Sequence, residues 1–135
     1  MSVSNIHKAI YDVLENTGNT VCSGLRTAAT PTPCYVYEVQ TMELAAQMRG
    51  VSALNHWTVT VEVACVADTV AAVCTLVDDL SDLFDAGPIN YTGALSCSIA
   101  LGSFQVAFST ATPDDGQQDA ERIGTVTLSL LIQED

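Results

Sequence analysis

Hydrophobic and polar positions along the chain follow two different periods, and these periods predict where helices and strands lie. Over residues 4–16 the apolar positions are three or four apart, which predicts an amphipathic helix with the stripe Ile6, Ala9, Ile10, Val13 and Leu14. Asn16-Thr17-Gly18 follows, a combination typical of a left-handed turn that ends a helix. Residues 17–33 have no such period, and we expect irregular chain there up to the prolines Pro31 and Pro33.

Two strands are predicted in the next part of the chain. Residues 34–39 are aromatic and β-branched, which favours a short strand. Residues 56–66 alternate strictly between apolar and polar, with Trp57 and the valines on one face, and this is the plainest strand of the sequence. The intervening residues 41–55 fit either a short helix or a long loop with an extended piece.

A second helix is predicted from Val70 to Phe84, because apolar residues return to a helical spacing there. We expect Asp68 to cap its start and Gly87-Pro88 to stop it. Its other face is acidic, with Asp78, Asp79, Asp82 and Asp85.

The last third of the chain predicts two long strands joined by a polar loop. Over residues 95–108 the apolar positions change from odd to even at Gly102-Ser103. A β-bulge or a two-residue hairpin turn explains this change, and we favour the bulge because it leaves one long strand to pair with the last strand, residues 122–132. Residues 109–121 have no apolar period and predict a mobile, solvated acidic loop.

These elements come in the order helix, strand, strand, helix, strand, strand. The order predicts a single α+β domain over residues 1–135, built as a mainly antiparallel four-stranded sheet with two helices packed on one face. We find no internal repeat and no linker.

Composition narrows the class of protein. Of 135 residues, 48% are apolar and 15% charged, which excludes a disordered chain. Sixteen acids oppose four bases, for a net charge of −12. A chain so poor in bases lacks the means to hold nucleic-acid phosphates or an anionic membrane, so we expect neither specific nucleic-acid binding nor membrane binding. No apolar run is long enough for a bilayer span, and the first residues do not read as a secretory signal.

Candidate chemistry is sparse, and we predict a protein that is not an enzyme. No catalytic, cofactor-binding or metal-binding motif is present, and a pair formed by a cysteine with His7 or His56 is the one enzymatic arrangement left open. Asp114, Asp115 and Asp119 suggest calcium, but their spacing does not match an EF-hand. The five cysteines are an odd number without a Cys-x-x-Cys pair, which favours buried or half-buried free thiols in a reducing cytoplasm: Cys22, Cys34, Cys65, Cys74 and Cys97.

One pattern points to assembly. The face of the predicted strands opposite the core is small and neutral, as in Thr58/Thr60, Ser96/Ser98/Ala100 and Thr125/Thr127/Ser129. Such a face can pack against another subunit without burying unpaired charge. The alternative is that threonine simply suits an exposed strand. The low content of charged residues favours assembly.

The order of parts resembles the small tail-terminator (tail-completion) proteins of long-tailed bacteriophages. The resemblance lies in the helix Ile6–Leu14, the stretch ending Pro33-Cys-Tyr-Val-Tyr-Glu-Val39, the strand His56–Val63, the helix Val70–Phe84, and the final strand pair around Asp114-Asp115-Gly116. The residues 42–55 and the near absence of bases depart from the family pattern.

The resemblance implies a virion structural protein, assembled in the host bacterial cytoplasm and located where tail meets neck. Members of that family form a hexameric ring on the end of the tail tube, stop its polymerisation and offer a surface to head-completion proteins. The implied partners are further copies of the chain in a cyclic homo-oligomer, the tail tube protein and a head-completion or neck protein. DNA passes through such a ring, and an anionic lumen would let it slide.

The residues that we expect to touch partners or the lumen are the loop acids Asp114, Asp115, Asp119 and Glu121. Two other interpretations remain: another ring protein of the neck, such as a head-completion (connector) protein, or a small ligand-binding α+β domain with an apolar pocket.

Overall fold

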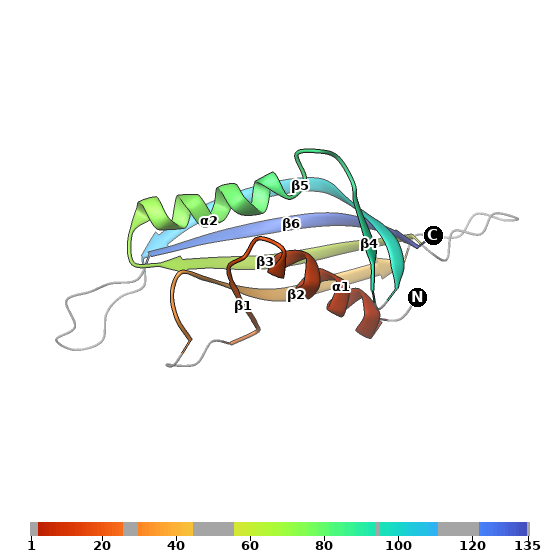
Figure 1. The fold of residues 1–135 in the computed structure, drawn as a ribbon, viewed down its shortest axis with the longest axis horizontal. Coiled ribbons are helices and arrows are strands. Elements are labelled where there is room, and N and C mark those ends of the chain that lie inside the picture. The colour runs from red at the N-terminus through yellow and green to blue at the C-terminus, as the bar shows by residue number, and fades with distance from the viewer. Residues whose placement is uncertain (1–2, 26–29, 45–55, 94, 111–121, 135) are drawn as a thin grey trace, which may run out of the picture.

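The computed structural model describes residues 3–25, 30–44, 56–93, 95–110 and 122–134. Two helices lie on one six-stranded sheet with the order β1-β2-β3-β6-β5-β4 (Figure 1). The helices are α1 (Val3–Glu15) and α2 (Val70–Asp82). The strands are β1 (Thr20–Ser23), β2 (Cys34–Leu44), β3 (His56–Ala67), β4 (Ile89–Thr92), β5 (Ser96–Thr110) and β6 (Arg122–Glu134).

The chain is α+β, but the predicted four-stranded, mainly antiparallel sheet is wrong. The sheet has six strands of mixed direction, because β1 runs parallel to β2, and it curls into a half-barrel. The two missed strands, β1 and β4, have four residues each, too short for a period to be visible in the sequence. β1 lies in the stretch 17–33 that we expected to be irregular. β2 continues to Leu44, so the start of the ambiguous stretch 41–55 is strand; residues 45–55 lie outside the described part.

Helix α1 forms as its pattern predicts. Its apolar stripe is buried against the sheet, from Ile6 to Leu14. At its end the Thr17 hydroxyl donates to the Leu14 carbonyl over 2.7 Å. Gly18 then takes φ +82°, the left-handed conformation that the sequence predicts and that glycine adopts without a steric penalty.

Helix α2 begins at Val70, as predicted, but its cap lies one residue later in the chain than expected. β3 continues to Ala67, and the N-cap is Thr69, whose hydroxyl oxygen accepts the backbone N–H of Ala72. Asp68 is exposed and does not fill the cap position, so that prediction is wrong. Aspartate is the better cap by type, but here the side chain placed to accept the Ala72 N–H, three residues on, is the hydroxyl of Thr69.

The bulge predicted at Gly102-Ser103 is confirmed. The pairing of β5 with β6 shifts between Leu101 and Ser103, and the two strands pair along most of their length. β2 has a second irregularity, between Val39 and Thr41, in its pairing with β3. Each bulge adds one residue and thereby returns the apolar side chains beyond it to the helix side of the sheet.

The core lies between the helices and one face of the sheet. Val59, Val61 and Val63 of β3 are fully buried there, beside Val126 and Leu128 of β6. Both helices contribute to this same cluster. The cavity that Ile10, Val61 and Leu128 help to line has a volume of about 10 Å³, which is too small for a ligand. None of the described helices is long and apolar enough to cross a membrane.

Candidate functional site

The face of the sheet away from the helices has no covering layer among the described elements. We call it the open face. On β3 every second residue from Thr58 to Ala64 lies on it, and these alternate with buried valines. The pairing registers place the matching residues of the next strands on the same side. It consists mainly of small neutral side chains: Thr58, Thr60, Ala64, Ala100, Ser103, Ala107, Thr125, Thr127 and Ser129.

Two features of the open face are costly for an isolated monomer. Glu38 of β2 and Glu62 of β3 are directly opposite each other in the register, and both are exposed. Like charges in this position destabilise a sheet. Leu131 of β6 also lies on this face and is 52% exposed. It borders a hollow of about 330 Å³ shared with Thr58 and Ala100. The described residues of the face include no Lys or Arg.

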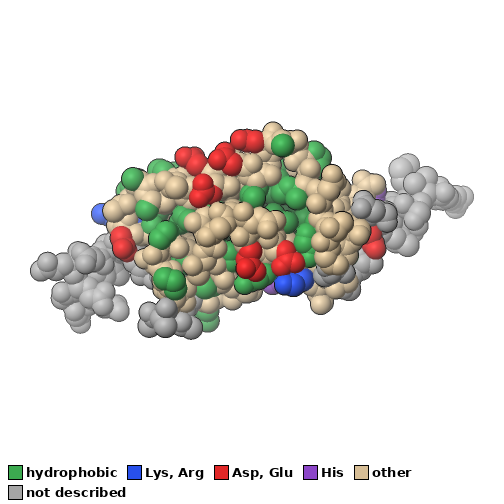
Figure 2. Space-filling model, in the orientation of Figure 1, with side chains coloured by type: hydrophobic (Ala, Val, Ile, Leu, Met, Phe, Trp, Pro, Cys, Tyr) green, Lys and Arg blue, Asp and Glu red, His purple; other side chains and the backbone are tan. Residues whose placement is uncertain are grey.

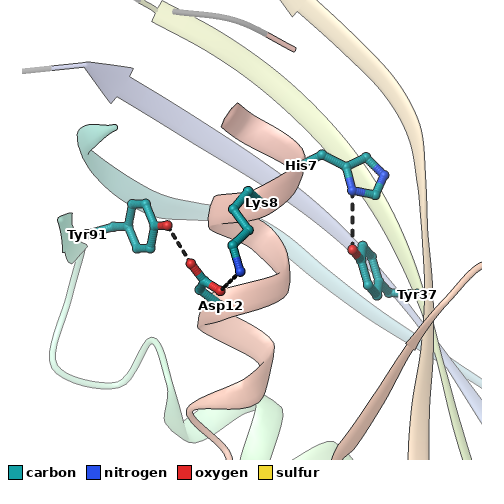
Figure 3. Close-up of polar contacts among 5 residues, drawn as sticks. All are labelled: His7, Lys8, Asp12, Tyr37 and Tyr91. Atoms are coloured by element: carbon teal, nitrogen blue, oxygen red, sulfur yellow. Dashed lines mark hydrogen bonds and ion pairs between the residues drawn. The ribbon is translucent and has the colours of Figure 1, made fainter. Parts of the chain in front are cut away.

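On the opposite side, α1 is fastened to two strands by polar contacts (Figure 3). Tyr91 of β4 donates to Asp12 Oδ2 over 2.6 Å, and Lys8 Nζ lies 2.9 Å from Asp12 Oδ1. The bond from Tyr91, followed by that from Lys8, holds the pKa of Asp12 below its usual range. Towards β2, His7 Nδ1 and the Tyr37 hydroxyl are 3.2 Å apart.

An open groove of about 650 Å³ lies beside α1, lined by Val3, His7, Tyr11 and Tyr37 among others. The imidazole and the phenol are paired with each other. The hydrogen bond identified for His7 is therefore structural, between helix and strand.

The acidic face of α2 is exposed, and Figure 2 shows acidic side chains gathered over this helix. Desolvation by neighbouring atoms, then the negative charge of Asp85, raises the pKa of the exposed Asp82. Asp79 accepts a hydrogen bond from the Asn19 amide over 3.2 Å. The face therefore combines mutual repulsion with one contact that ties α2 to the chain after α1.

The thiols differ in burial. Cys34, Cys65 and Cys97 are buried, Cys22 is half-buried and Cys74 is exposed. All five are free, but the exposed Cys74 departs from the expectation that every thiol is buried or half-buried. Burial, followed by the proximity of Cys34, raises the pKa of Cys65 to about 12. A nucleophilic thiol needs a lowered pKa, so Cys65 has the opposite character. His56, the other histidine considered for catalysis, is exposed at the start of β3.

The loop acids proposed from the sequence, Asp114, Asp115, Asp119 and Glu121, lie outside the described residues. The calcium hypothesis that rests on three of them lies there as well. Within the described parts of the chain, no group of three His, Cys, Asp or Glu side chains is placed to hold a metal ion.

Sequence reasoning found the small neutral face but missed Leu131 and the facing Glu38 and Glu62. Leu131 stands next to Leu130 in an apolar run, so its outward direction depends on the register. The Glu38–Glu62 contact depends on which strands pair, and periodicity does not contain that information.

Comparison with known proteins gives the fold. No protein-family model matches the chain, and no curated protein matches it in sequence. Among 23 solved chains that match in structure, one known by a sequence identifier alone superposes with a TM-score of 0.59 at 15% identity. The match covers 100% of this chain and 98% of the other, so the whole architecture is one that another protein adopts.

Proposed function

We propose that this chain is a structural protein of a long-tailed bacteriophage, a tail terminator that forms a ring on the head-proximal end of the tail tube. The observation that carries the proposal is the open face, a long sheet surface of small neutral side chains with Leu131 exposed within it. The neutral part of this surface can be buried against another protein without burying an unpaired charge. The resemblance in the order of parts supplies the family.

The acidity of the chain fits this function. Sixteen acids against four bases give each copy a charge of −12, and part of this charge would line the lumen of the ring. Phosphates are repelled by such a lumen, so DNA passes without being held. The partners in this proposal are further copies of the chain, the tail tube and a neck or head-completion protein. Its place is the virion, after assembly in the bacterial cytoplasm.

The filled core distinguishes this proposal from a ligand-binding domain. That alternative requires an enclosed apolar pocket of several hundred Å³, whereas the cavity inside the described core holds about 10 Å³. Another neck protein would share the ring and the open face. The two kinds of protein differ in where they bind, since a terminator caps the end of a tail tube and another neck protein does not.

Electron microscopy in negative stain tests the proposal, with purified protein at high concentration, alone and mixed with isolated phage tail tubes. We expect six-fold rings with six times the mass of the 14.2 kDa chain, and density on one end of each tube. Rings that ignore tubes would indicate another neck protein. Particles of one or two chains at every concentration, with bare tube ends, would contradict a ring protein.

A pair of matched substitutions tests the role of the open face. Thr127→Lys places a charge in the middle of this face, whereas Thr75→Lys places the same charge on an exposed position of α2. We expect Thr127→Lys to abolish tube capping and Thr75→Lys to leave it intact. Equal effects would show that net charge, and not the open face, controls binding.

A further inference from the structure

The sheet has two free strand edges, one on each side, and each belongs to the second half of a long strand. β1 pairs only with residues 34–37 of β2, and β4 pairs only with residues 96–99 of β5 (Figure 1). Among the described residues, β2 from Val39 to Leu44 and β5 from Leu101 to Thr110 are therefore paired on one side only. Free N–H and C=O groups of such edges are templates for another strand.

Apart from its bulge at Gly102, the edge of β5 lacks the usual protection of an exposed strand. Proteins guard free edges with charged residues, prolines, bulges or a covering element. β5 has neither a charged residue nor a proline in its 15 residues. It lies within residues 86–113, which carry no charge in a chain of net charge −12. This neutral edge is where a second acidic copy can approach with least repulsion.

Apolar side chains on the helix side follow both free edges. Phe104 and Val106 of β5 are half-buried, and Phe108 is 61% exposed. On β2, Val39 and Met42 are half-buried, and Leu44 is 37% exposed. By contrast, the helix-side residues of the central strand β6, such as Leu128, are buried. A strand added at each edge would bury the remaining exposed surface of these apolar side chains on β5 and on β2.

We propose that the free half of β5 in one copy pairs with the free half of β2 in the next copy, so that the sheets of a ring are continuous. β2, β3, β6 and β5 alternate in direction, which makes β5 antiparallel to the β2 that follows it. The contact joins two different patches and is heterologous, as a cyclic ring requires. This inference specifies which strands join neighbouring subunits in the proposed ring. It depends on the proposed function only in assuming that the contacts close into a ring.

The positions of the two free strand halves along the strand direction are compatible with closure of the sheets into a ring. Phe108 lies in one row with Tyr35, near one end of the sheet, whereas Leu44 lies in one row with Ile99, near the other end. Joining the halves therefore staggers each copy along the strands. A sheet that closes on itself needs such a stagger, because its strands must tilt relative to the axis.

Charge favours β2 over a second β5 as the partner. Glu38 and Glu43 are exposed on the open-face side of β2. Pairing β2 with another β2 would bring these acids close to the same acids of the second copy. Pairing β5 with β5 would leave the acids of β2 without a hydrogen-bonding partner from the other copy. Against β5, an antiparallel register brings one of these acids beside Gln105 or Ser103, whose amide and hydroxyl groups can donate hydrogen bonds to a carboxylate.

Charges of opposite sign introduced at position 105 should have opposite effects on the association of copies, and this difference tests the contact. Gln105→Glu would place a carboxylate near the β2 acids and should weaken association at least ten-fold by sedimentation equilibrium. Gln105→Lys should strengthen it. Gln133 is the matched control, since it is exposed on the same face but lies on the inner strand β6. Its Glu and Lys variants should change association by less than three-fold.

Photo-crosslinking identifies the partner strand. p-Benzoylphenylalanine in place of Phe108 keeps an aromatic ring at the edge, and mass spectrometry locates the residue that it joins. We expect attachment to residues 39–44 of another copy. Attachment to residues 101–110 would show a two-fold β5–β5 contact and overturn the proposal. Rings without any crosslink between copies would overturn the edge contact and leave the ring function standing. Monomers at every concentration would overturn both.

Discussion

Tyr91 on the edge strand β4 donates a 2.6 Å hydrogen bond to Asp12 on α1, which joins residues 79 positions apart. The same helix also packs beside β1, the strand at the opposite edge of the sheet. A flat sheet of six strands would place its edges too far apart for one helix to reach both. The hydrogen bond is therefore a direct consequence of the curl of the sheet around α1.

Loss of this bond should destabilise the fold. Tyr91 is buried, and its hydroxyl bonds a carboxylate that is 31% exposed. We expect Tyr91→Phe to lower the free energy of unfolding by about 1–2 kcal/mol at pH 7, at the lower end for a hydrogen bond to a charged group because of this exposure. Urea denaturation at dilute protein concentration measures the change.

The penalty of Tyr91→Phe should depend on pH. The pKa of Asp12 is lowered in the folded state, so its contribution is complete above the ordinary carboxyl pKa and is lost as the pH falls through the folded value. The penalty should therefore shrink below about pH 4. In an Asp12→Asn background the acid dependence should disappear. A penalty that stays constant down to pH 2.5 would show that the hydroxyl does not act through the Asp12 carboxylate.

Gly124 is required by close packing between β6 and α2. A Cβ at this position would lie 2.7 Å from Cγ1 of Val73, which is buried and stiff at χ1. We expect Gly124→Ala to cost about 1–3 kcal/mol by overpacking. Val73→Ala also destabilises by itself, but it removes the clashing methyl. The double variant should therefore be more stable than the sum of the two losses, and strict additivity would contradict the contact.

Stability should fall in alkali because of a buried thiol. Burial raises the pKa of Cys65 to about 12, and burial also raises the pKa of Tyr35. Each folded group keeps its proton after the unfolded chain has lost it. Stability is thus complete below the ordinary pKa and should fall above about pH 9 by up to 1.4 kcal/mol per pH unit per group. Cys65→Ala should flatten the fall between pH 9 and 10, and Cys74→Ala should not.

Thiol labelling should separate the cysteines by exposure. With iodoacetamide at pH 8, Cys74 should react within minutes, and Cys34, Cys65 and Cys97 should react only as fast as the structure opens. Intact mass gives the number of adducts with time. Cys74→Ser should remove the fast phase. Rapid modification of Cys65 in the folded protein would be evidence for the reactive thiol that an enzyme requires.

The long elements of the fold follow from the sequence because one face of each is continuously buried. Val59, Val61 and Val63 and the stripe of α1 show this plainly. β1 and β4 could not be predicted from the sequence, because each has only four residues. An edge strand pairs with one neighbour only, and four residues are too few to show an alternation of apolar and polar positions. The parallel pairing of β1 with β2 is a tertiary relation, and local spacing does not encode it.

The open face was predictable in composition but not in arrangement. Thr127 and Ser129 alternate with buried residues, and this alternation predicts a neutral outer face. That Glu62 meets Glu38 depends on the register of two strands separated by a long connection. The free edge of β5 had a sequence signal, the long uncharged stretch 86–113, whose meaning becomes visible only once β4 is seen to cover so little of the strand.

The two bulges have a consequence for how this chain tolerates changes in length. At Gly102 β5 has one residue more than its partner β6, and the bulge accommodates it. Deleting Gly102 would remove the bulge and leave Leu101, Ser103 and Phe104 in strict alternation, so the side chains beyond it would keep their faces. Deleting Thr127 from β6, which has no bulge in its pairing with β3, would instead turn the side chains on one side of the deletion to the opposite face. Gain or loss of a single residue should therefore be tolerated at the two bulges of β2 and β5, and should be rare elsewhere in the long strands of relatives of this protein.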